Sequence, residues 1–235
     1  MNITIYDCVT GDPLRDRYGS IALRIEAWIG PHLPEAEFSM VHVAGGERMP
    51  QPDTVDGVII SGSEKGVYDD TPWMQPLRDN LEQMRVAGVP MFGICFGHQI
   101  MADVFGGKAQ KADKGFVTGS RSFETANGEL RSYLAHQDQV SDVPPGAEVI
   151  ASAPHCPVAA LAYDFPALSV QFHPEYDAAF TTDLIEMFGP QLMSPVEIEA
   201  ATATLSANVP RDLYCEEVAA FFRWRQSASC PSLGE

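Results

Sequence analysis

The sequence predicts an α/β fold: a doubly wound, mostly parallel sheet with helices on both faces and a small antiparallel extension. Three observations support this fold class. Strand and helix patterns alternate along the first hundred residues, as in parallel sheets. The early strand candidates are apolar throughout, which is typical of strands covered on both faces. From about residue 108 short strand candidates follow one another, which indicates antiparallel pairing.

The first predicted elements are a strand, a helix and a second strand. Residues 2–9 form a β-branched run that stops at a Gly-Asp-Pro sequence. Residues 20–30 carry isoleucine and tryptophan at helical spacing, and the helix is expected to end at Gly30 and Pro31. Residues 37–44 are the second strand candidate.

The next four elements continue the alternation. Residues 56–63 are a continuous apolar run closed by a glycine turn, so we expect a third strand. Residues 72–88 begin with a proline and end with a glycine, which favours a helix between them. Residues 89–95 are the next strand candidate and residues 96–107 the next helix.

The second half of the chain contains the expected extension and the last helices. Helices are expected over residues 177–189 and, as a pair, over residues 195–226. No repeat or linker interrupts the chain, so we expect one domain over residues 1–190, with a helical extension over residues 191–235 packed on it. The extension strands are expected at residues 121–125, 148–153, 158–163 and 167–172.

Composition excludes several function classes. The chain has 32 acidic and 15 basic residues and a net charge of -17, so we expect binding neither to nucleic acid nor to an anionic membrane. Its five cysteines are widely spaced without a C-x-x-C pair, which disfavours a disulfide framework or a zinc site. No signal-peptide pattern or long apolar stretch occurs, so the cytoplasm is the expected compartment.

One cysteine lies in a distinctive setting. Cys95 is flanked by Gly93 and Gly97 in a G-x-C-x-G pattern, between a predicted strand and a predicted helix. This is the context of a nucleophile elbow, in which small neighbours allow a strained turn and the helix N-terminus favours a thiolate. The alternative is that Cys95 fills a core gap as a small hydrophobe. We interpret the other four cysteines as structural or incidental.

A cysteine nucleophile needs a base, and His173 is the candidate. It ends an apolar strand, and Glu175 lies two residues later, on the same side of an extended stretch. Pro174 between them cannot continue a strand ladder, as expected where a strand opens onto a cleft. The alternative is a surface histidine beside a surface glutamate. Together with the elbow, the pair favours a catalytic triad.

Acyl transfer also needs donors for the oxyanion. The backbone N–H of Phe96 is one candidate, because it directly follows the nucleophile. The turn at Ser61, Gly62 and Ser63 follows a predicted parallel strand, so it is expected at the same sheet edge as Cys95. The alternative for this turn is an ordinary loop.

These motifs resemble the class I (triad-type) glutamine amidotransferases. GICFGHQI, the later HPE and the upstream SGS carry the resemblance over roughly residues 3–188, and VYDDTPWM and HQDQV are similar to stand-alone members. The resemblance implies a flavodoxin-like core in which cysteine, histidine and glutamate hydrolyse the side-chain amide of glutamine. Many members have Gly-Gly-Pro where this chain has Gly62-Ser63-Glu64, which leaves the second oxyanion donor open.

The resemblance implies a role for each matching residue. Gln99 matches a residue that contacts bound glutamine, and main-chain groups at Gln137 and Asp138 match the holders of its α-amino and α-carboxylate ends. We interpret His98 and His136 as pocket-lining or turn residues. The remaining assignments are Cys95 as nucleophile, His173 as base, Glu175 as orienting acid, and Phe96 with Gly62 and Ser63 as the oxyanion hole.

Two enzymatic functions and one non-enzymatic function remain open. The first is a glutaminase-type amidotransferase that forms a γ-glutamyl thioester and releases glutamate and ammonia, with no metal or cofactor. A tail of about 45 residues is too short for a synthetase domain, so a separate synthetase chain would accept the ammonia. The second is a stand-alone γ-glutamyl peptidase or hydrolase. The third is an inactive binding or regulatory module on the same fold.

Overall fold

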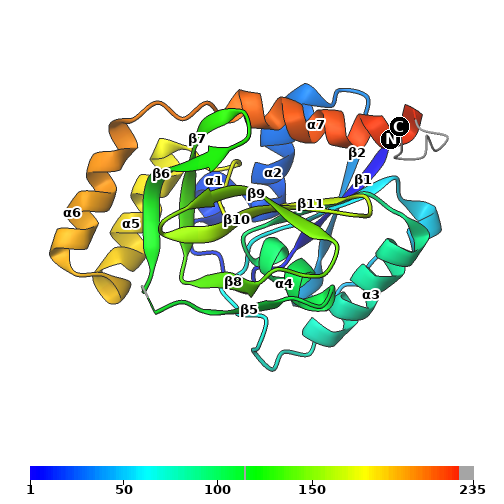
Figure 1. Cartoon of the computed structure of the whole chain (residues 1–235). Helices are drawn as coiled ribbons and strands as arrows, with labels where there is room; N and C mark the ends of the chain where they lie inside the picture. The colour runs from blue at the N-terminus through cyan, green and yellow to red at the C-terminus, as the bar shows by residue number, and fades with distance from the viewer. Residues whose placement is uncertain (114, 228–235) are drawn as a thin grey trace.

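The structure is a computed structural model that describes residues 1–113 and 115–227. In this part of the chain, a mixed sheet of nine strands has the order β2-β1-β3-β4-β11-β10-β9-β6-β7 (Figure 1). The first five are parallel, so the predicted doubly wound, mostly parallel sheet with helices on both faces is confirmed. These five are β1 (Asn2–Asp7), β2 (Glu37–His42), β3 (Gly57–Ile60), β4 (Met91–Ile94) and β11 (Ala167–Val170).

The position of β11 corrects one expectation. Its residues were assigned to the antiparallel extension, but β11 pairs in parallel with β4 as well as antiparallel with β10. It is therefore the junction between the two halves of the sheet. Its short apolar sequence fits either kind of pairing, because both leave such a strand buried on two faces.

The antiparallel half contains β10 (Cys156–Tyr163), β9 (Ala147–Ala153), β6 (Val117–Thr125) and β7 (Gly128–His136). The strand β7 had no predicted counterpart, because charged and polar residues occupy much of this edge strand. A separate two-stranded sheet, β5 (Lys108–Lys111) with β8 (Asp138–Asp142), was also missed. Both are polar strands without a clean apolar period.

Alternate residues of the parallel strands build two core layers. Ile59 faces one layer with α2 (Ile21–Ile29) and α7 (Arg211–Ser227), whereas Val58 and Ile60 face the other. Helices α3 (Met74–Ala87) and α4 (Phe96–Val104) cover this second face. On the first face, Phe92 packs against Trp28 of α2 and Tyr214 of α7, with ring centroids 6.2 and 6.5 Å apart.

The remaining helices lie near the carboxyl edge of the parallel strands and beside the antiparallel half. Helix α1 (Arg15–Tyr18) was not predicted. Asp177 caps α5 (Ala178–Leu192), and Ser194 forms a capping box on α6 (Pro195–Ala203). Short 3₁₀ turns occupy Gly30–His32, Val43–Gly45, Pro52–Thr54 and Thr204–Ser206. None of the helices within residues 1–113 and 115–227 is long and apolar enough to span a membrane.

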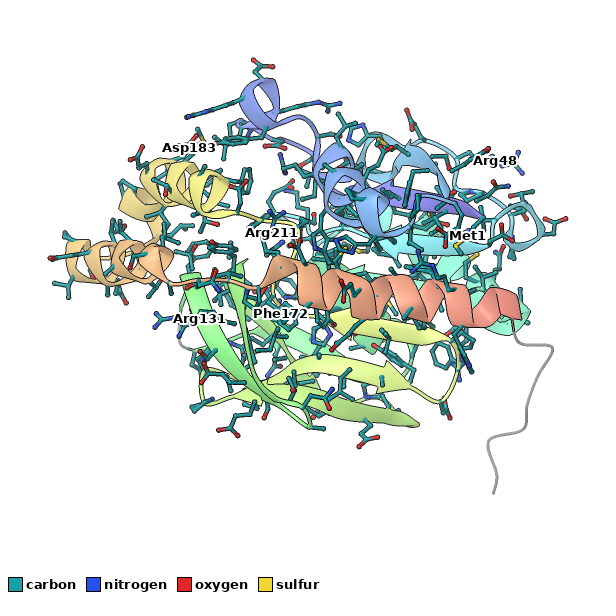
Figure 2. All side chains as sticks on the ribbon, turned by 90° about the horizontal axis from the view of Figure 1, so that it is seen from above. Met1, Arg48, Arg131, Phe172, Asp183 and Arg211 are labelled. Carbon is teal, nitrogen blue, oxygen red and sulfur yellow. The ribbon has the colours of Figure 1, made fainter. Side chains whose placement is uncertain are left out.

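The start of α7 is tied to the loop after β11. Arg211 donates hydrogen bonds from Nε to the carbonyl oxygen of Pro174 and from Nη2 to that of Glu175, at 3.2 and 2.9 Å. Figure 2 shows Arg211 at the first turn of this helix and Phe172 beside it. Phe172 packs edge-on against Tyr214, with ring centroids 5.2 Å apart. The last helix therefore supports the segment that carries His173 and Glu175.

Candidate active site

Three neighbouring strands bring the predicted residues to one edge of the sheet. Gly62 follows β3, Cys95 follows β4 and His173 follows β11, and these strands are adjacent in the sheet. The carboxyl ends of parallel strands meet at one edge, so segments far apart in sequence converge there. The arrangement follows directly from the strand order.

Cys95 has a strained backbone. With φ of 54° and ψ of -101°, it is the one non-glycine residue with positive φ in the described part of the chain. Its N–H donates to the carbonyl oxygen of Val170 at 2.8 Å, which fixes the turn against β11. Such strain is retained at sites where the surroundings fix the conformation, and here it directs the thiol away from the sheet.

The two flanking glycines are required by close packing. A Cβ on Gly93 would lie 2.6 Å from the backbone of Gly97, and a Cβ on Gly97 would lie 2.3 Å from the carbonyl oxygen of Ile60. Both contacts are far shorter than van der Waals separation. The G-x-C-x-G pattern is therefore explained by the approach of α4 to β3 and β4.

The Gly97→Ala variant is expected to lose about 2–3 kcal/mol of unfolding free energy, because a rigid backbone oxygen occupies the space of the new methyl group. Urea unfolding monitored by circular dichroism measures this loss. Gly30→Ala is the matched control, since Gly30 is helical and a Cβ there meets its nearest atom at 3.8 Å. Equal stability of the two variants would contradict this packing explanation.

His173 is held by three neighbours. Its Nδ1 is 2.7 Å from Oε1 of Glu175, its backbone N–H donates to Tyr133, and the ring of Tyr176 stacks on the imidazole at 4.0 Å. Burial disfavours the charged imidazole, but the Glu175 carboxylate and the Cys95 sulfur raise the pKa of His173 well above its ordinary value. The site thus favours an imidazolium between a carboxylate and a sulfur.

The backbone groups predicted for the oxyanion hole lie beside the sulfur. Phe96 is the first residue of α4, where the helix leaves N–H groups unpaired. Gly62 is so close to Cys95 and His173 that an added Cβ would be 3.0 Å from Cε1 of His173 and 3.7 Å from Cβ of Cys95. Ser63 follows it and lines the space around Cys95.

Two hollows are lined by Cys95. The polar hollow, of about 330 Å³, is lined by Cys95, Tyr68, Gln99, Lys111, Gln137 and Asp138. The apolar hollow, of about 150 Å³, is lined by Cys95, His173, Leu14, Ile21, Phe180, Leu184 and Phe188. The three residues matched to substrate binding, Gln99, Gln137 and Asp138, therefore all face the polar hollow.

A chain of amides connects the polar hollow to the sulfur. The Nε2 of Gln99 donates to the carbonyl oxygen of Asp138 at 2.8 Å and to Oε1 of Gln171 at 3.2 Å. The Nε2 of Gln171 in turn donates to the Cys95 sulfur at 3.6 Å. Gln171 was missed from the sequence, although its position two residues before His173 in an extended stretch is the signal that places both on one side.

The carbonyl oxygens of Gln137 and Asp138, in the predicted substrate-binding segment, already accept hydrogen bonds from within the protein. The carbonyl oxygen of Asp138 accepts from Gln99 and lies 3.1 Å from Nδ1 of His136, and that of Gln137 accepts from the N–H of Ala112. These bonds fix the loop between β7 and β8. A ligand in the polar hollow would therefore meet a rigid backbone, with the side chains of Lys111 and Asp138 beside it.

The other histidines named from the sequence have different settings. His136 lines the polar hollow, as expected, and burial lowers its pKa to about 3. His98 does not line it: its nitrogens lie 2.8 Å from Oγ of Ser169 and 3.1 Å from the carbonyl oxygen of Val158, inside the core. The pocket or turn interpretation of His98 is therefore wrong, because α4 turns this face toward the sheet.

The other described cysteines are buried away from the hollows. Cys8, Cys156 and Cys215 have no exposed surface, and burial raises the pKa values of the Cys8 and Cys215 thiols. Cys230 lies outside the described residues. Within residues 1–113 and 115–227, no group of three or more His, Cys, Asp or Glu side chains is placed to hold a metal ion.

Comparison with known proteins identifies the family. Residues 36–188 match the family described as Glutamine amidotransferase class-I. The chain belongs to the class I glutamine amidotransferases. Two solved glutamine amidotransferases share the fold at 19% identity: one from Thermotoga maritima with a TM-score of 0.73, covering 94% of this chain and 97% of that one, and one from Methylobacillus flagellatus with a TM-score of 0.74, covering 99% and 98%.

The curated relatives in this amidotransferase family differ in length. Gamma-glutamyl peptidase 3 of Arabidopsis thaliana is 30% identical over 174 residues, which cover 67% of this chain and 70% of the peptidase. A glutamine-hydrolyzing GMP synthase of Burkholderia mallei (strain SAVP1) is 35% identical over 136 residues, covering 51% of this chain and 24% of the synthase. The chain thus matches most of the peptidase but only about a quarter of the synthase.

Proposed function

We propose that this protein hydrolyses γ-glutamyl amide bonds, that of glutamine included, with Cys95 as nucleophile, His173 as acid and base, and Glu175 as orienting carboxylate. The observation that supports this most strongly is the strained cysteine at positive φ, which lines one hollow together with an imidazole that is itself 2.7 Å from a buried carboxylate. A nucleophile, a base and an orienting acid in this order are what acyl transfer requires.

The proposed reaction has two steps. The Cys95 thiolate attacks the carbonyl carbon of the γ-amide group, and the N–H groups of Phe96 and of the Gly62–Ser63 turn stabilise the oxyanion. The C–N bond then breaks, His173 gives its proton to the departing amine, and a γ-glutamyl thioester remains. Water, deprotonated by His173, hydrolyses the thioester and releases glutamate.

The second candidate within this chemistry is a stand-alone γ-glutamyl peptidase or hydrolase, and the coverage of the relatives favours it. The match spans 70% of gamma-glutamyl peptidase 3 but only 24% of the GMP synthase. Transfer of ammonia would instead require a separate synthetase chain, which co-purification with an ATP-binding partner would identify. Either activity fits the cytoplasm, the compartment proposed from the sequence.

The test is an assay of the purified protein for glutamate release from glutamine and from γ-glutamyl dipeptides. Release from at least one substrate is expected, with the thioester trapped as a covalent adduct detectable by mass spectrometry. Silence on every γ-glutamyl compound by a folded protein would overturn the proposal and favour the inactive binding module.

A further inference from the structure

The polar and apolar hollows meet at the reacting sulfur. They share Ser63, Glu64, Cys95 and Ala135, so one molecule attached at Cys95 can extend into both. Of the two, the apolar hollow is the one lined by His173. If the proposed function holds, this difference indicates which hollow receives the glutamyl half of a substrate and which receives the departing amine.

The position of the imidazole decides which half lies where. In the proposed reaction His173 gives its proton to the departing nitrogen, so that nitrogen must lie on the His173 side of the sulfur. Any substituent on the nitrogen then points into the apolar hollow. The glutamyl half, with its charged α-amino and α-carboxylate groups, points into the polar hollow, where Lys111 and Asp138 offer both signs of charge.

The apolar hollow has a lining that suits a hydrocarbon group. Phe180 and Leu184 of α5 are 4 and 7% exposed and face Leu14 and Ile21 across the hollow. Its volume of about 150 Å³ equals that of an apolar protein cavity known to bind benzene. A departing ammonia uses almost none of this space, whereas an amine with one aromatic ring would fill it.

The charges at the apolar hollow are already paired or negative. Arg24 donates from Nη1 to the carbonyl oxygen of Gly19 at 2.7 Å and from Nη2 to Oδ2 of Asp12 at 3.1 Å, whereas its buried Nε has no partner among the described residues. Its guanidinium lies 4.4 Å from the ring centre of Phe180. Glu64 at the mouth accepts hydrogen bonds from Thr10. A carboxylate entering this space would meet the acidic groups of Asp12 and Glu64, while the arginine that lines the hollow is already ion-paired with Asp12.

We infer that the apolar hollow is a leaving-group subsite that selects γ-glutamyl amides of small apolar primary amines, about one aromatic ring in size. Both free glutamine and γ-glutamyl amino acids, whose carboxylate adjoins the scissile nitrogen, are poorer substrates. The reaction releases the intact amine: the sulfur–carbon bond forms, the carbon–nitrogen bond breaks, and the nitrogen leaves with the proton from His173. Water then converts the thioester to glutamate.

Three substrates separately test the preference of the subsite for an aromatic ring and its exclusion of a carboxylate. γ-Glutamylbenzylamide carries one ring, glutamine carries none, and γ-glutamyl-L-phenylglycine is the benzylamide with one added carboxylate. We expect kcat/KM for the benzylamide to exceed that for glutamine at least tenfold, because burying one ring in an apolar site accounts for such a factor. A similar or larger preference is expected over the phenylglycine compound.

A substitution that fills the hollow tests the location. Leu184→Phe is expected to lower the ratio of kcat/KM for benzylamide over glutamine at least tenfold. Leu213→Phe is the matched control, because Leu213 is 63% exposed on α7, away from both hollows, and the ratio should not change. Thermal melts establish that both variants fold. An unchanged ratio in folded Leu184→Phe would overturn the location.

Binding to the Cys95→Ala variant separates this inference from the proposed function. Calorimetry is expected to show the benzylamide binding at least tenfold more tightly than glutamine. Equal binding, or equal turnover by an enzyme that does hydrolyse glutamine, would overturn the subsite and leave the function standing. Absence of all turnover together with selective binding would overturn the function and support the subsite. Equal turnover of benzylamide and phenylglycine compounds would overturn the exclusion of carboxylates.

Discussion

Cys95→Ala is expected to abolish glutamate release, with a loss in kcat at least on the order of 10⁴-fold. Without the sulfur no thioester forms, and no other described cysteine reaches the two hollows. Alanine also removes little packing volume, because Cys95 lies beside open space and is 5% exposed. The measurement is single-turnover glutamate release, with thermal melts to establish folding.

Cys156→Ala and Cys215→Ala are the matched controls. Both thiols are buried, and Cys215 donates to the carbonyl oxygen of Trp28 at 3.2 Å, so their loss affects core packing rather than the reaction. Each is expected to retain nearly full kcat and to lose about 1 kcal/mol of stability. A loss of activity in folded Cys156→Ala comparable to that in Cys95→Ala would refute Cys95 as the unique nucleophile.

His173→Asn and Glu175→Gln are expected to differ in severity. Without the imidazole, no neighbouring group can take the thiol proton or deliver one to the departing amine, so His173→Asn should lose on the order of 10⁴-fold in kcat. Glu175 lines neither hollow, and its Oε1 lies 2.7 Å from Nδ1 of His173. A thiolate–imidazolium pair partly maintains its own charge. We therefore expect Glu175→Gln to lose only about 10- to 1,000-fold.

Activity of the same variants measured from pH 6 to pH 10 tests whether Glu175 acts by stabilising the charged form of His173. The Glu175 carboxylate raises the pKa of His173, so Glu175→Gln should lower the pH at which the imidazole loses its proton. Titration of the His173 ring by NMR reports this directly. If folded Glu175→Gln is as inactive as Cys95→Ala, orientation of the imidazole alone does not explain the loss of activity. Glu175 must then contact the substrate or hold the strand end in place.

The parallel half of the fold was predictable because burial on both faces leaves a strong trace in the sequence. Strands such as β3 and β4 are continuous apolar runs, and every residue in them is buried. In contrast, β7 and β8 have exposed polar residues, and no local pattern separates them from loops. Their pairing depends on partners far along the chain, which periodicity does not encode.

The candidate site, like the fold, was predictable only where its residues leave a local pattern in the sequence. Cys95 has a local signature because its strain requires small neighbours, and His173 with Glu175 are two residues apart in an extended segment. Gln171 and Tyr176 lie two residues before and three residues after His173, but no motif marks them. Their contacts with the Cys95 sulfur and the His173 ring become evident only in the folded structure. The apolar hollow likewise joins α5 to the segment before α2, a contact across some 160 residues.

The bonds from Arg211 to the carbonyl oxygens of Pro174 and Glu175 affect how this protein can be dissected. The segment that matches the family ends at residue 188, before this arginine. A fragment cut at that point would keep Cys95, His173 and Glu175 yet lose the guanidinium that anchors the backbone between the latter two. A fragment that also began at residue 36, where the matching segment starts, would lack β1, which lies between β2 and β3 in the sheet. The segment that matches the family thus leaves out two structural supports, the strand β1 and the Arg211 guanidinium, which a shortened version of this protein should keep.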